Sequence, residues 1–361
     1  MARMLDVART AGVSRSTVSN VFNSPERVRP EIRKRVEAAA RALNYGGPDP
    51  RARALRAGKA NAIGLVLPVS LTGAMHHSYL RNFIGGVAEV CDEHHAGLAL
   101  LSAVDRKAAA RGVREALVDG FVLHNPAEVE MLVALAERRG LPFVAVDMDA
   151  PAHVSSILLD NRGGARRAAR HLLDLGHRRF AVLSLLLERT GDSGPFYHPP
   201  GDPDRRVVES FHDTRERLAG FADALADAGI AIGDVPIVES RSGDEDAARG
   251  AALLLDRAPE VTAVLAMADD SAIALMEAAR RRGIAVPADL SVVGFDDIPQ
   301  ASLGVPPLTT VAQPIREKGR RAAQYVFNPH PPAEPQHVVL PVELVVRAST
   351  APPRSDGRRR G

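Results

Sequence analysis

The chain has 361 residues, of which 45% are hydrophobic and one is cysteine, so it can form two or three folded domains but no internal disulfide. Its net charge of +2 is unevenly spread: residues 1–60 hold 13 Lys and Arg against 5 Asp and Glu, whereas the remainder holds 33 against 39. A basic segment followed by a mildly acidic body is typical of a nucleic-acid-binding domain joined to a separate domain. No apolar run reaches membrane-spanning length and the N-terminus does not read as a signal peptide, so we expect a cytoplasmic protein.

Two short helices are predicted at the N-terminus. Apolar residues with helical spacing occupy positions 5–11 and stop at Gly12, and Ser14 is a favourable N-cap for a second short run. Two short helices joined by a tight turn that contains glycine form a helix-turn-helix.

The second of these helices opens with Arg15 and Ser16, and Asn20 follows one turn later. In a recognition helix, side chains at these positions reach base edges in the major groove. The alternative from this stretch alone is an ordinary helical hairpin with a solvated polar face.

A third helix is predicted over residues 30–43, with an apolar stripe that should pack across the first two helices. A basic linker follows at residues 48–60, and its helical part is only about two turns long, too short to be stable alone in water. We expect it to fold on contact with DNA. Its large apolar side chain, Leu55, either wedges between base pairs in the minor groove or packs back on the protein.

From residue 61 onward, strands and helices alternate. Strands are predicted at 63–67, 98–101, 120–123, 143–147, 156–159, 180–184, 235–238, 261–266 and 290–294, and helices at 83–94, 128–138, 162–175, 214–228, 245–257 and 271–282, with a further helix ending at 117. Repeated βαβ units form parallel sheets, and this number of units requires two α/β lobes. We expect the chain to cross between lobes near residue 160 and near 309–314, and a last strand at 337–346 to return to the second lobe.

Two lobes joined by several crossings form a hinged cleft, the usual architecture for capturing a small polar molecule. No glycine-rich phosphate loop follows any strand, and no Cys/His cluster has metal-ligand spacing, so we expect neither a cofactor nor a metal. No nucleophile–base pair or carboxylate pair stands out, so we do not expect an enzyme.

Along most of its length the sequence resembles transcription regulators of the lactose-repressor family (LacI/GalR). The matching segments keep the family's order: DVARTAGVSRSTVSNVFN (6–23), PDPRARALRAGK (48–59), IGLVLP (63–68), VDGFVLH (118–124), LPFVAVD (141–147), LDNRGGARRAARHLLDLGHRRFAVL (159–183), RERLAGFADAL (215–225), ADDSAIALMEAARRRGIAVPADLSVVGFDDIP (268–299) and PPLTTVAQP (306–314). The resemblance implies an α/β protein with an N-terminal all-α helix-turn-helix head, a hinge helix and a two-lobed, periplasmic-binding-protein-like core of parallel α/β sheets. The implied boundaries are 1–47 for the head, 48–60 for the hinge, 61–350 for the core and 351–361 for a disordered tail, with an N-lobe at about 61–160 and 312–328 and a C-lobe at about 161–311 and 336–349.

The resemblance also assigns DNA-contacting residues. Arg15 and Ser16 match the base-reading pair of the recognition helix, whereas Asn20 stands where many members have arginine. Because Asn favours adenine edges and Arg favours guanine, the operator sequence cannot be carried over. The other implied DNA contacts are Ser14, Thr17 and Asn23 to phosphates, with Arg53 and Leu55 from the hinge to the minor groove, which favours the wedge for Leu55.

In the core, Arg217 matches an arginine that binds ligand hydroxyls or carboxylates in relatives, and Asp270 matches an aspartate that accepts from ligand hydroxyls. An Arg and an Asp that face each other across a cleft suit a polyhydroxyl ligand. The alternatives are a surface ion pair with Asp213 for Arg217 and a helix N-terminal acid for Asp270. Other candidates are Phe221, for sugar stacking or core packing, and Asp147 and Gln313 in the pocket, whereas Asp160, Asp296 and Asp297 are interpreted as hinge and turn residues.

Residues 185–213 form a much longer connection than many relatives have, and it is rich in Pro and Gly. Long loops in compact domains are often functional lids. We therefore expect a lid over the pocket, with Phe196, Tyr197 and His198 facing the ligand.

Together these features predict a ligand-responsive repressor. A homodimer, with a dimer of dimers as the alternative, would bind double-stranded operator DNA, and an effector in the cleft, most simply a sugar or sugar derivative, would control that binding. The competing interpretations are a solute-binding or sugar-processing protein that shares the core fold, and a constitutive architectural DNA binder.

Overall fold

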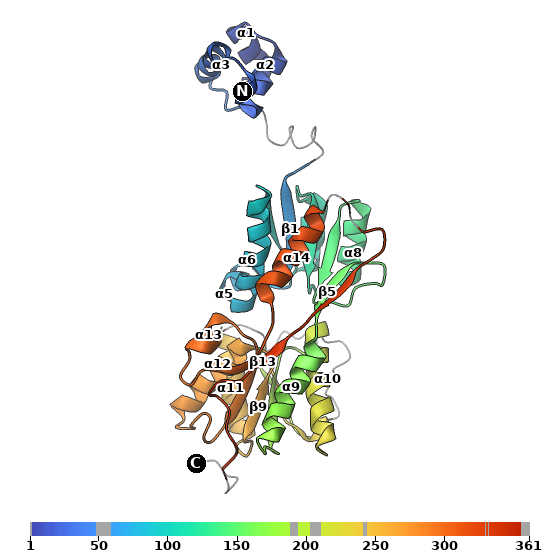
Figure 1. Cartoon of the computed structure of the whole chain (residues 1–361), viewed down its shortest axis with the longest axis vertical. Helices are drawn as coiled ribbons and strands as arrows, with labels where there is room; N and C mark the ends of the chain where they lie inside the picture. The colour runs from blue at the N-terminus through green and yellow to red at the C-terminus, as the bar shows by residue number, and fades with distance from the viewer. Residues whose placement is uncertain are drawn as a thin grey trace. The chain divides into compact units, whose positions relative to one another are not determined.

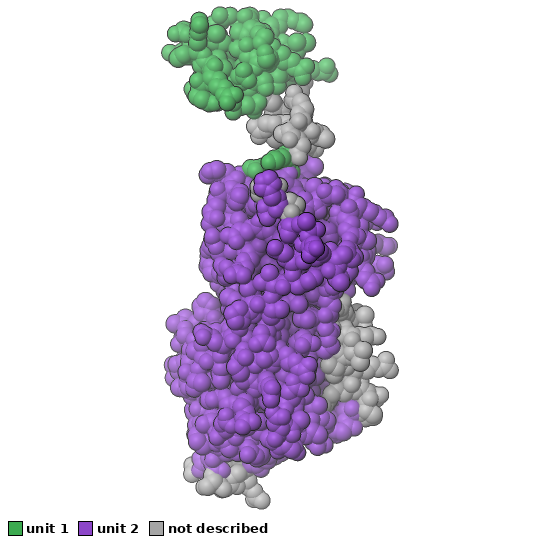
Figure 2. All heavy atoms as spheres, turned by 45° about the vertical axis from the view of Figure 1, so that its right-hand side comes forward, with its two compact units in different colours: residues 1–61 green, residues 62–361 purple. Residues whose placement is uncertain are grey.

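Figure 1 shows the computed structural model of the chain, which describes residues 2–47, 59–187, 194–202, 211–240, 244–328, 330 and 332–354. The chain divides into two compact units, residues 1–61 and residues 62–361, which Figure 2 shows in different colours. Most of the predicted hinge helix, with Arg53 and Leu55, lies outside the described residues.

Residues 1–61 contain a three-helix head. Its helices are α1 (Met4–Ala11), α2 (Arg15–Asn23) and α3 (Pro30–Ala42), with a 3-10 turn, η1 (Pro25–Arg27), before α3. Gly12 ends α1 with a φ of 62°, and Ser14 caps α2 by accepting a hydrogen bond from the Thr17 amide at 3.1 Å. Small side chains make up the buried core: Val7, Ala8, Ala11, Val18, Val21, Val36, Ala39 and Ala40. The predicted helix-turn-helix with a third helix packed across it is confirmed.

The N-lobe of residues 62–361 is built on a six-stranded sheet whose paired strands are all parallel. The strand order is β12-β5-β4-β3-β1-β2, with β1 (Ala62–Leu67), β2 (Gly97–Ser102), β3 (Gly120–His124), β4 (Phe143–Val146), β5 (Ser156–Leu159) and β12 (His337–Leu340). Its helices are α5 (Leu71–His76), α6 (Ser78–Glu93), α7 (Arg106–Glu115), α8 (Val129–Arg138) and α14 (Ile315–Phe327). Helices α6 and α14 pack together on one face of the sheet, and α7 and α8 cover the other.

The C-lobe is built on a seven-stranded sheet that is parallel except at its two edges. The order is β13-β11-β10-β9-β6-β8-β7, with β6 (Phe180–Ser184), β7 (Phe196–His198), β8 (Ile237–Glu239), β9 (Ala263–Ala266), β10 (Ser291–Asp296), β11 (Thr309–Ala312) and β13 (Glu343–Val345). Its helices are α9 (Asn161–Asp174), α10 (His212–Asp227), α11 (Asp244–Arg257), α12 (Asp269–Arg281) and α13 (Pro299–Leu303), with a 3-10 turn, η2 (Ile232–Asp234). Along β6, Phe180 and Val182 pack on the α9–α10 side and Ala181 and Leu183 on the α11–α12 side, which explains its continuous apolar run.

Helices α6 and α14 approach each other closely because both have glycine at the contact. A Cβ atom on Gly86 would lie 2.1 Å from the carbonyl oxygen of Arg316, and one on Gly319 would lie 2.3 Å from that of Phe83. This contact places Lys318, the residue before Gly319, against the first turns of α6.

The expected last strand at 337–346 is wrong in one respect. It is two strands: β12 pairs with β5 of the N-lobe and β13 pairs with β11 of the C-lobe, with Pro341 and Val342 between them. Proline has no amide hydrogen to continue a strand's hydrogen bonds, so the chain leaves the first sheet there. The crossings predicted near 160 and 309–314 are confirmed, since β5 is followed by α9 and β11 by α14. Helix α6 begins at Ser78, five residues before its predicted start.

Candidate functional site

The polar face of α2 carries the side chains predicted to read DNA. Arg15, Ser16 and Asn20 are exposed, whereas Val18 and Val21 point into the core of the head. Ser14 uses its hydroxyl to cap the helix and lies 2.7 Å from the Ser16 hydroxyl and 2.8 Å from that of Thr17. Asn23 donates to the Ser19 hydroxyl at 3.1 Å. The helix therefore presents a guanidinium and hydroxyls in its first turn, and amides further along the same helix.

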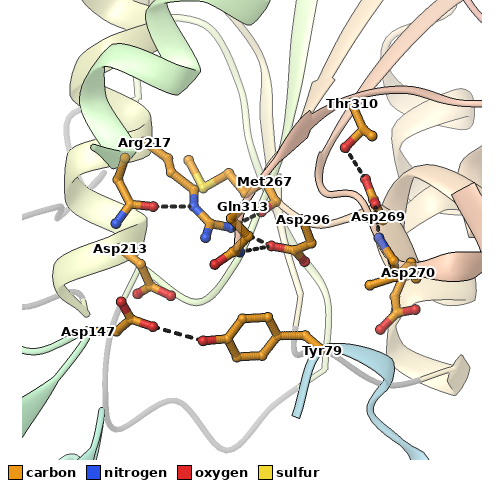
Figure 3. Close-up of polar contacts among 12 residues, drawn as sticks. Tyr79, Asp147, Asp213, Arg217, Met267, Asp269, Asp270, Asp296, Thr310 and Gln313 are labelled. Carbon is orange, nitrogen blue, oxygen red and sulfur yellow. Dashed lines mark hydrogen bonds and ion pairs between the residues drawn. The ribbon is translucent and has the colours of Figure 1, made fainter. Parts of the chain in front are cut away.

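The N-lobe side of the cleft is organised around Asp147, which directly follows β4 (Figure 3). It is buried and has a φ of 53°, a conformation that a residue other than glycine adopts only when its surroundings hold it there. The Tyr79 hydroxyl donates to Asp147 Oδ2 at 2.8 Å and lies 3.0 Å from His124 Nε2. The ammonium of Lys318 forms an ion pair with the same carboxylate oxygen.

The electrostatics of this group follow from the ion pair. Burial alone would raise the pKa of Asp147, but the charge of Lys318 and the hydrogen bond with His124 outweigh burial and lower it below its ordinary value. Burial and the neighbouring Asp147 charge raise the pKa of Tyr79. Asp147 is therefore ionised and Tyr79 is a neutral donor at physiological pH.

The C-lobe side is organised around Arg217 on α10, which is 4% exposed. Its Nε donates to Asn161 Oδ1 at 2.9 Å, its Nη1 donates to the Met267 carbonyl, and its guanidinium lies 3.8 Å from the centroid of the Phe295 ring. Asp296, the last residue of β10, has its Oδ1 3.6 Å from Arg217 Nη1. The guanidinium is thus held by two hydrogen bonds over the Phe295 ring, beside a buried acid.

Gln313 joins the two sides. Its Nε2 donates to Asp296 Oδ1 at 2.5 Å, and its Oε1 accepts from Lys318 Nζ at 3.0 Å. Because Gln313 lies where the chain crosses from β11 to α14, the network runs without interruption from Asp147 in the N-lobe to Arg217 in the C-lobe.

Direct contacts between the lobes surround this network. Asn125 Nδ2 donates to Asp213 Oδ1 at 3.3 Å, and Asp149 accepts from Arg215 at 2.9 and 3.0 Å. On the other side, Asp270 Oδ2 lies 3.8 Å from His77 Nδ1. The lobes are therefore held together around the buried polar groups.

Several buried polar atoms of the network have no hydrogen-bond partner in the part of the chain that the structure describes. They are His124 Nδ1, Asn125 Oδ1, Asp147 Oδ1 and Asn161 Nδ2. Buried polar atoms in folded proteins are nearly always hydrogen-bonded, so a group of such atoms at one place indicates a site for a polar ligand.

Two of the predicted pocket assignments need correction. Asp296, which is interpreted from the sequence as a turn residue, is the acid beside Arg217. Asp270 lies on the same lobe as Arg217, with its Oδ2 3.8 Å from His77 Nδ1, and it lines a groove of about 630 Å³ formed mainly by α11 and α12. Its contact with a ligand stays a prediction. Phe221 is 1% exposed within the hydrophobic core, so core packing is its role here. Arg217 forms no surface pair with Asp213, because it is buried.

The prediction of a lid over the pocket is also wrong for residues 196–198. Residues 196–198 form β7, an edge strand that pairs with β8. Tyr197 donates to the Arg257 carbonyl at 3.5 Å, and His198 Nδ1 lies 2.8 Å from Asp202. Edge-strand pairing explains why this apolar and aromatic stretch occurs in a connection rich in Pro and Gly.

Sequence analysis missed Tyr79, His124 and Lys318. His124 ends β3, which is the position where ligand-binding side chains gather in parallel sheets, so its placement was available as a signal. Tyr79 and Lys318 lie on helices, and no pattern in the sequence marks them as neighbours of Asp147.

The described residues were also considered for membrane-spanning helices and for metal sites. In the ranges set out above, no helix is long and apolar enough to cross a membrane. The same residues contain no group of three or more His, Cys, Asp or Glu side chains arranged to hold a metal ion.

Comparison with known protein families gives three matches that together span most of the chain. Residues 3–47 match "Bacterial regulatory proteins, lacI family", residues 60–192 match "Periplasmic binding proteins and sugar binding domain of LacI family", and residues 169–350 match "Periplasmic binding protein-like domain".

Individual proteins are similar over nearly the full length. An HTH-type transcriptional regulator from Mycolicibacterium smegmatis is 36% identical over 358 residues, covering 98% of this chain and 97% of the relative. The lac repressor dimer bound to operator and the anti-inducer ONPF is 27% identical, with a TM-score of 0.72 over 97% of this chain and 99% of that one. The complex of the transcriptional regulator CelR with cellobiose is 27% identical, with a TM-score of 0.67 over 97% and 100%.

Proposed function

The chain belongs to the LacI family of bacterial regulatory proteins and is a DNA-binding transcription regulator; from this premise we propose that it is a cytoplasmic, dimeric repressor whose operator affinity is controlled by a sugar-like effector in the cleft. The observation that carries the proposal is the buried network from Asp147 to Arg217, with its unpartnered polar atoms. A constitutive DNA binder would have no use for such a network. The proposal assigns no catalytic step to any residue.

In the head, Arg15, Ser16 and Asn20 contact base edges of the operator. Their exposure on one face of α2 supports this role, because a recognition helix enters the major groove with its N-terminal half. The proposed phosphate contacts are made by Ser14, Thr17 and Asn23, and the minor-groove contacts by Arg53 and Leu55 of the hinge. Phosphate contacts make operator binding strongly dependent on salt.

In the core, Arg217 donates to effector hydroxyls, and Asp147 and Asp296 accept from them. Gln313 holds Asp296 and contributes its amide group to the same wall of the site. Asp270 stays a candidate contact at the edge of the cleft. Since the effector touches both lobes, its binding changes the free energy of lobe closure, and coupling of this kind between two sites is typically about 1–3 kcal/mol.

Exposed apolar side chains on and next to two helices of the core support the dimer. Leu303 is 78% exposed on α13, and Val305 is 95% exposed just after it. Leu71 and Met75 on α5 are also exposed, and Figure 1 shows α5 and α13 on the same side. Exposed apolar side chains that gather on one face of a soluble protein mark an interaction surface.

The test is binding of the full-length protein to its own upstream DNA, measured by fluorescence anisotropy at several salt concentrations and with a panel of pentoses, hexoses and disaccharides. We expect tight binding that weakens by about 10³-fold or more between 50 and 200 mM salt, and one sugar that shifts it. Binding that is insensitive to every sugar would contradict effector control. Absence of specific binding at all salt concentrations would contradict the assignment of Arg15, Ser16 and Asn20.

A further inference from the structure

Lys318 stands apart from the other lysines of the chain. Lys34, Lys59 and Lys107 are exposed, whereas Lys318 is fully buried. A lysine is almost never fully buried unless its ammonium is paired, because desolvation of the charge is costly. A fully buried lysine in the middle of a candidate ligand site therefore calls for a functional explanation.

The polar contacts of the Lys318 side chain connect it to the candidate effector site. Its Nζ is paired with Asp147, donates to Gln313 Oε1 at 3.0 Å and lies 4.9 Å from the centre of the Tyr79 ring. Burial lowers the pKa of Lys318, and the Asp147 charge opposes that effect.

Each lobe thus supplies one buried ion pair to the cleft. In the N-lobe the pair is Lys318–Asp147, and in the C-lobe it is Arg217–Asp296, with Gln313 bonded to one member of each. In the N-lobe pair, the charges of Lys318 and Asp147 cancel. The other groups that face Asp147 are Tyr79 and His124 from the N-lobe, and from the opposite lobe Asp213 bonds to Asn125, which follows His124 in the sequence.

We propose that Lys318 is a specificity-determining residue: as the built-in counter-ion of Asp147, it makes the N-lobe wall of the cleft electrically neutral and so selects an uncharged polyhydroxyl effector over amino or acidic analogues. The inference rests on the proposed sugar-like effector and adds its charge class. Because Lys318 and Asp147 are already paired, an ammonium group on the effector finds no free carboxylate to pair with. A carboxylate group on the effector likewise finds no free ammonium.

The unpartnered atoms support the same ligand class. Asp147 Oδ1 and Asn125 Oδ1 need a donor, whereas Asn161 Nδ2 needs an acceptor. A hydroxyl group donates and accepts, so a polyol satisfies all three atoms. A carboxylate group of an effector placed against the two oxygens has no donor to offer and would leave them buried without a hydrogen bond.

The experiment is isothermal titration calorimetry of the full-length protein with neutral sugars and their charged counterparts: glucose, galactose, ribose and cellobiose, then glucosamine, galactosamine, glucuronate and galacturonate. For the wild type we expect at least one neutral sugar to bind, and its charged counterparts to bind about tenfold more weakly or worse, which corresponds to about 1.4 kcal/mol.

Two mirror-image variants test the counter-ion itself. Lys318→Met leaves Asp147 unpaired, so the ratio of amino-sugar affinity to neutral-sugar affinity should rise about tenfold. Asp147→Asn leaves Lys318 unpaired, so the ratio of uronate affinity to neutral-sugar affinity should rise about tenfold. The double variant should restore the preference for neutral sugars. Lys107→Met, which alters an exposed lysine on α7, is the matched control and should keep wild-type ratios. If either single variant fails to fold, the other still tests the pair.

The outcomes separate the two proposals. If neutral and charged sugars bind the wild type equally well, or if both single variants keep its ratios, Lys318 does not select for charge although the effector assignment stands. If none of the eight compounds binds the wild type, the sugar-like effector is contradicted, and the selectivity assigned to Lys318 is contradicted with it.

Discussion

The reading face of α2 and the cleft of the core are built in opposite ways. The first uses side chains from residues 14–23, one contiguous stretch, and leaves most of them exposed. The second gathers buried side chains from residues 79 to 318, contributed by strand ends and helices of both lobes. An exposed surface made of neighbours in sequence tolerates substitution without loss of fold, whereas a buried network does not. We therefore expect substitutions on the exposed face of α2 to change DNA binding without changing stability. Substitutions in the cleft should change ligand binding and stability together.

The hydrophobic cores of the head and of residues 62–361 also differ, in the size of the side chains that they bury. The fully buried side chains of the head are all valines and alanines, whereas the core unit fully buries large side chains such as Phe83, Phe121 and Phe295. A core of small side chains removes less apolar area from water, so the head has a small margin of stability.

The largest effect is expected when the cleft network is broken at Arg217. Arg217→Ala removes the guanidinium from above the Phe295 ring and leaves Asp296 buried without its partner. Breaking a buried ion pair costs about 3–5 kcal/mol, so urea unfolding of the core should shift by several kcal/mol and sugar binding should be lost. Arg215→Ala, which alters a half-exposed arginine on the same helix, is the control and should cost less than about 1 kcal/mol. Equal shifts in the two variants would mean that the Arg217 network adds nothing to stability.

The second effect is expected at the head and should show the opposite pattern. Arg15→Ala removes an exposed side chain that we assign to a base edge, so operator binding should weaken by about 1–3 kcal/mol while thermal unfolding and sugar binding stay unchanged. Fluorescence anisotropy and calorimetry on the same sample would measure both properties. Arg41→Ala, on the exposed side of α3, serves as the control. An Arg15 variant with wild-type affinity for specific DNA would remove this residue from the reading face.

The smallest effect is a pH dependence at the edge of the C-lobe sheet. Burial would lower the pKa of His198, but Glu239 and Asp202 outweigh burial and raise it above its ordinary value of 6.5. A raised pKa in the folded state stabilises the protein below the unfolded-state pKa, and this contribution is lost as the pH rises through the folded-state pKa.

His198→Gln should therefore lower the stability measured by urea unfolding at pH 6 more than at pH 8. A His198 variant that loses equal stability at both pH values would show that its ion pairs do not contribute.

The head could be predicted from sequence almost completely because its information is local. The cap at Ser14, the turn at Gly12 and the apolar spacing of α3 each depend on residues a few positions apart. The strands of the core were also predicted well, because a strand buried on both faces leaves a continuous apolar run, as in β6.

The cleft could be predicted only in part. The sequence predicts Asp147, Arg217 and Gln313 as site residues, but it does not mark Asp296, because only the packed lobe shows that this side chain reaches the Arg217 guanidinium. Lys318 depends on how closely α14 approaches α6, which is set by Gly86 and Gly319 across more than 200 residues of chain. Contacts at that sequence separation leave no periodic signal.

The division of residues 337–345 between two sheets has a consequence for the order in which the parts of the protein fold during synthesis. The N-lobe sheet takes its edge strand from residues 337–340 and its covering helix from residues 315–327, and the C-lobe sheet takes β13 from residues 343–345. On the ribosome, therefore, neither lobe is complete until residues 337–345 have emerged, whereas the three-helix head can fold as soon as its residues leave the exit tunnel. During synthesis a DNA-binding head thus exists before the core that is to regulate it.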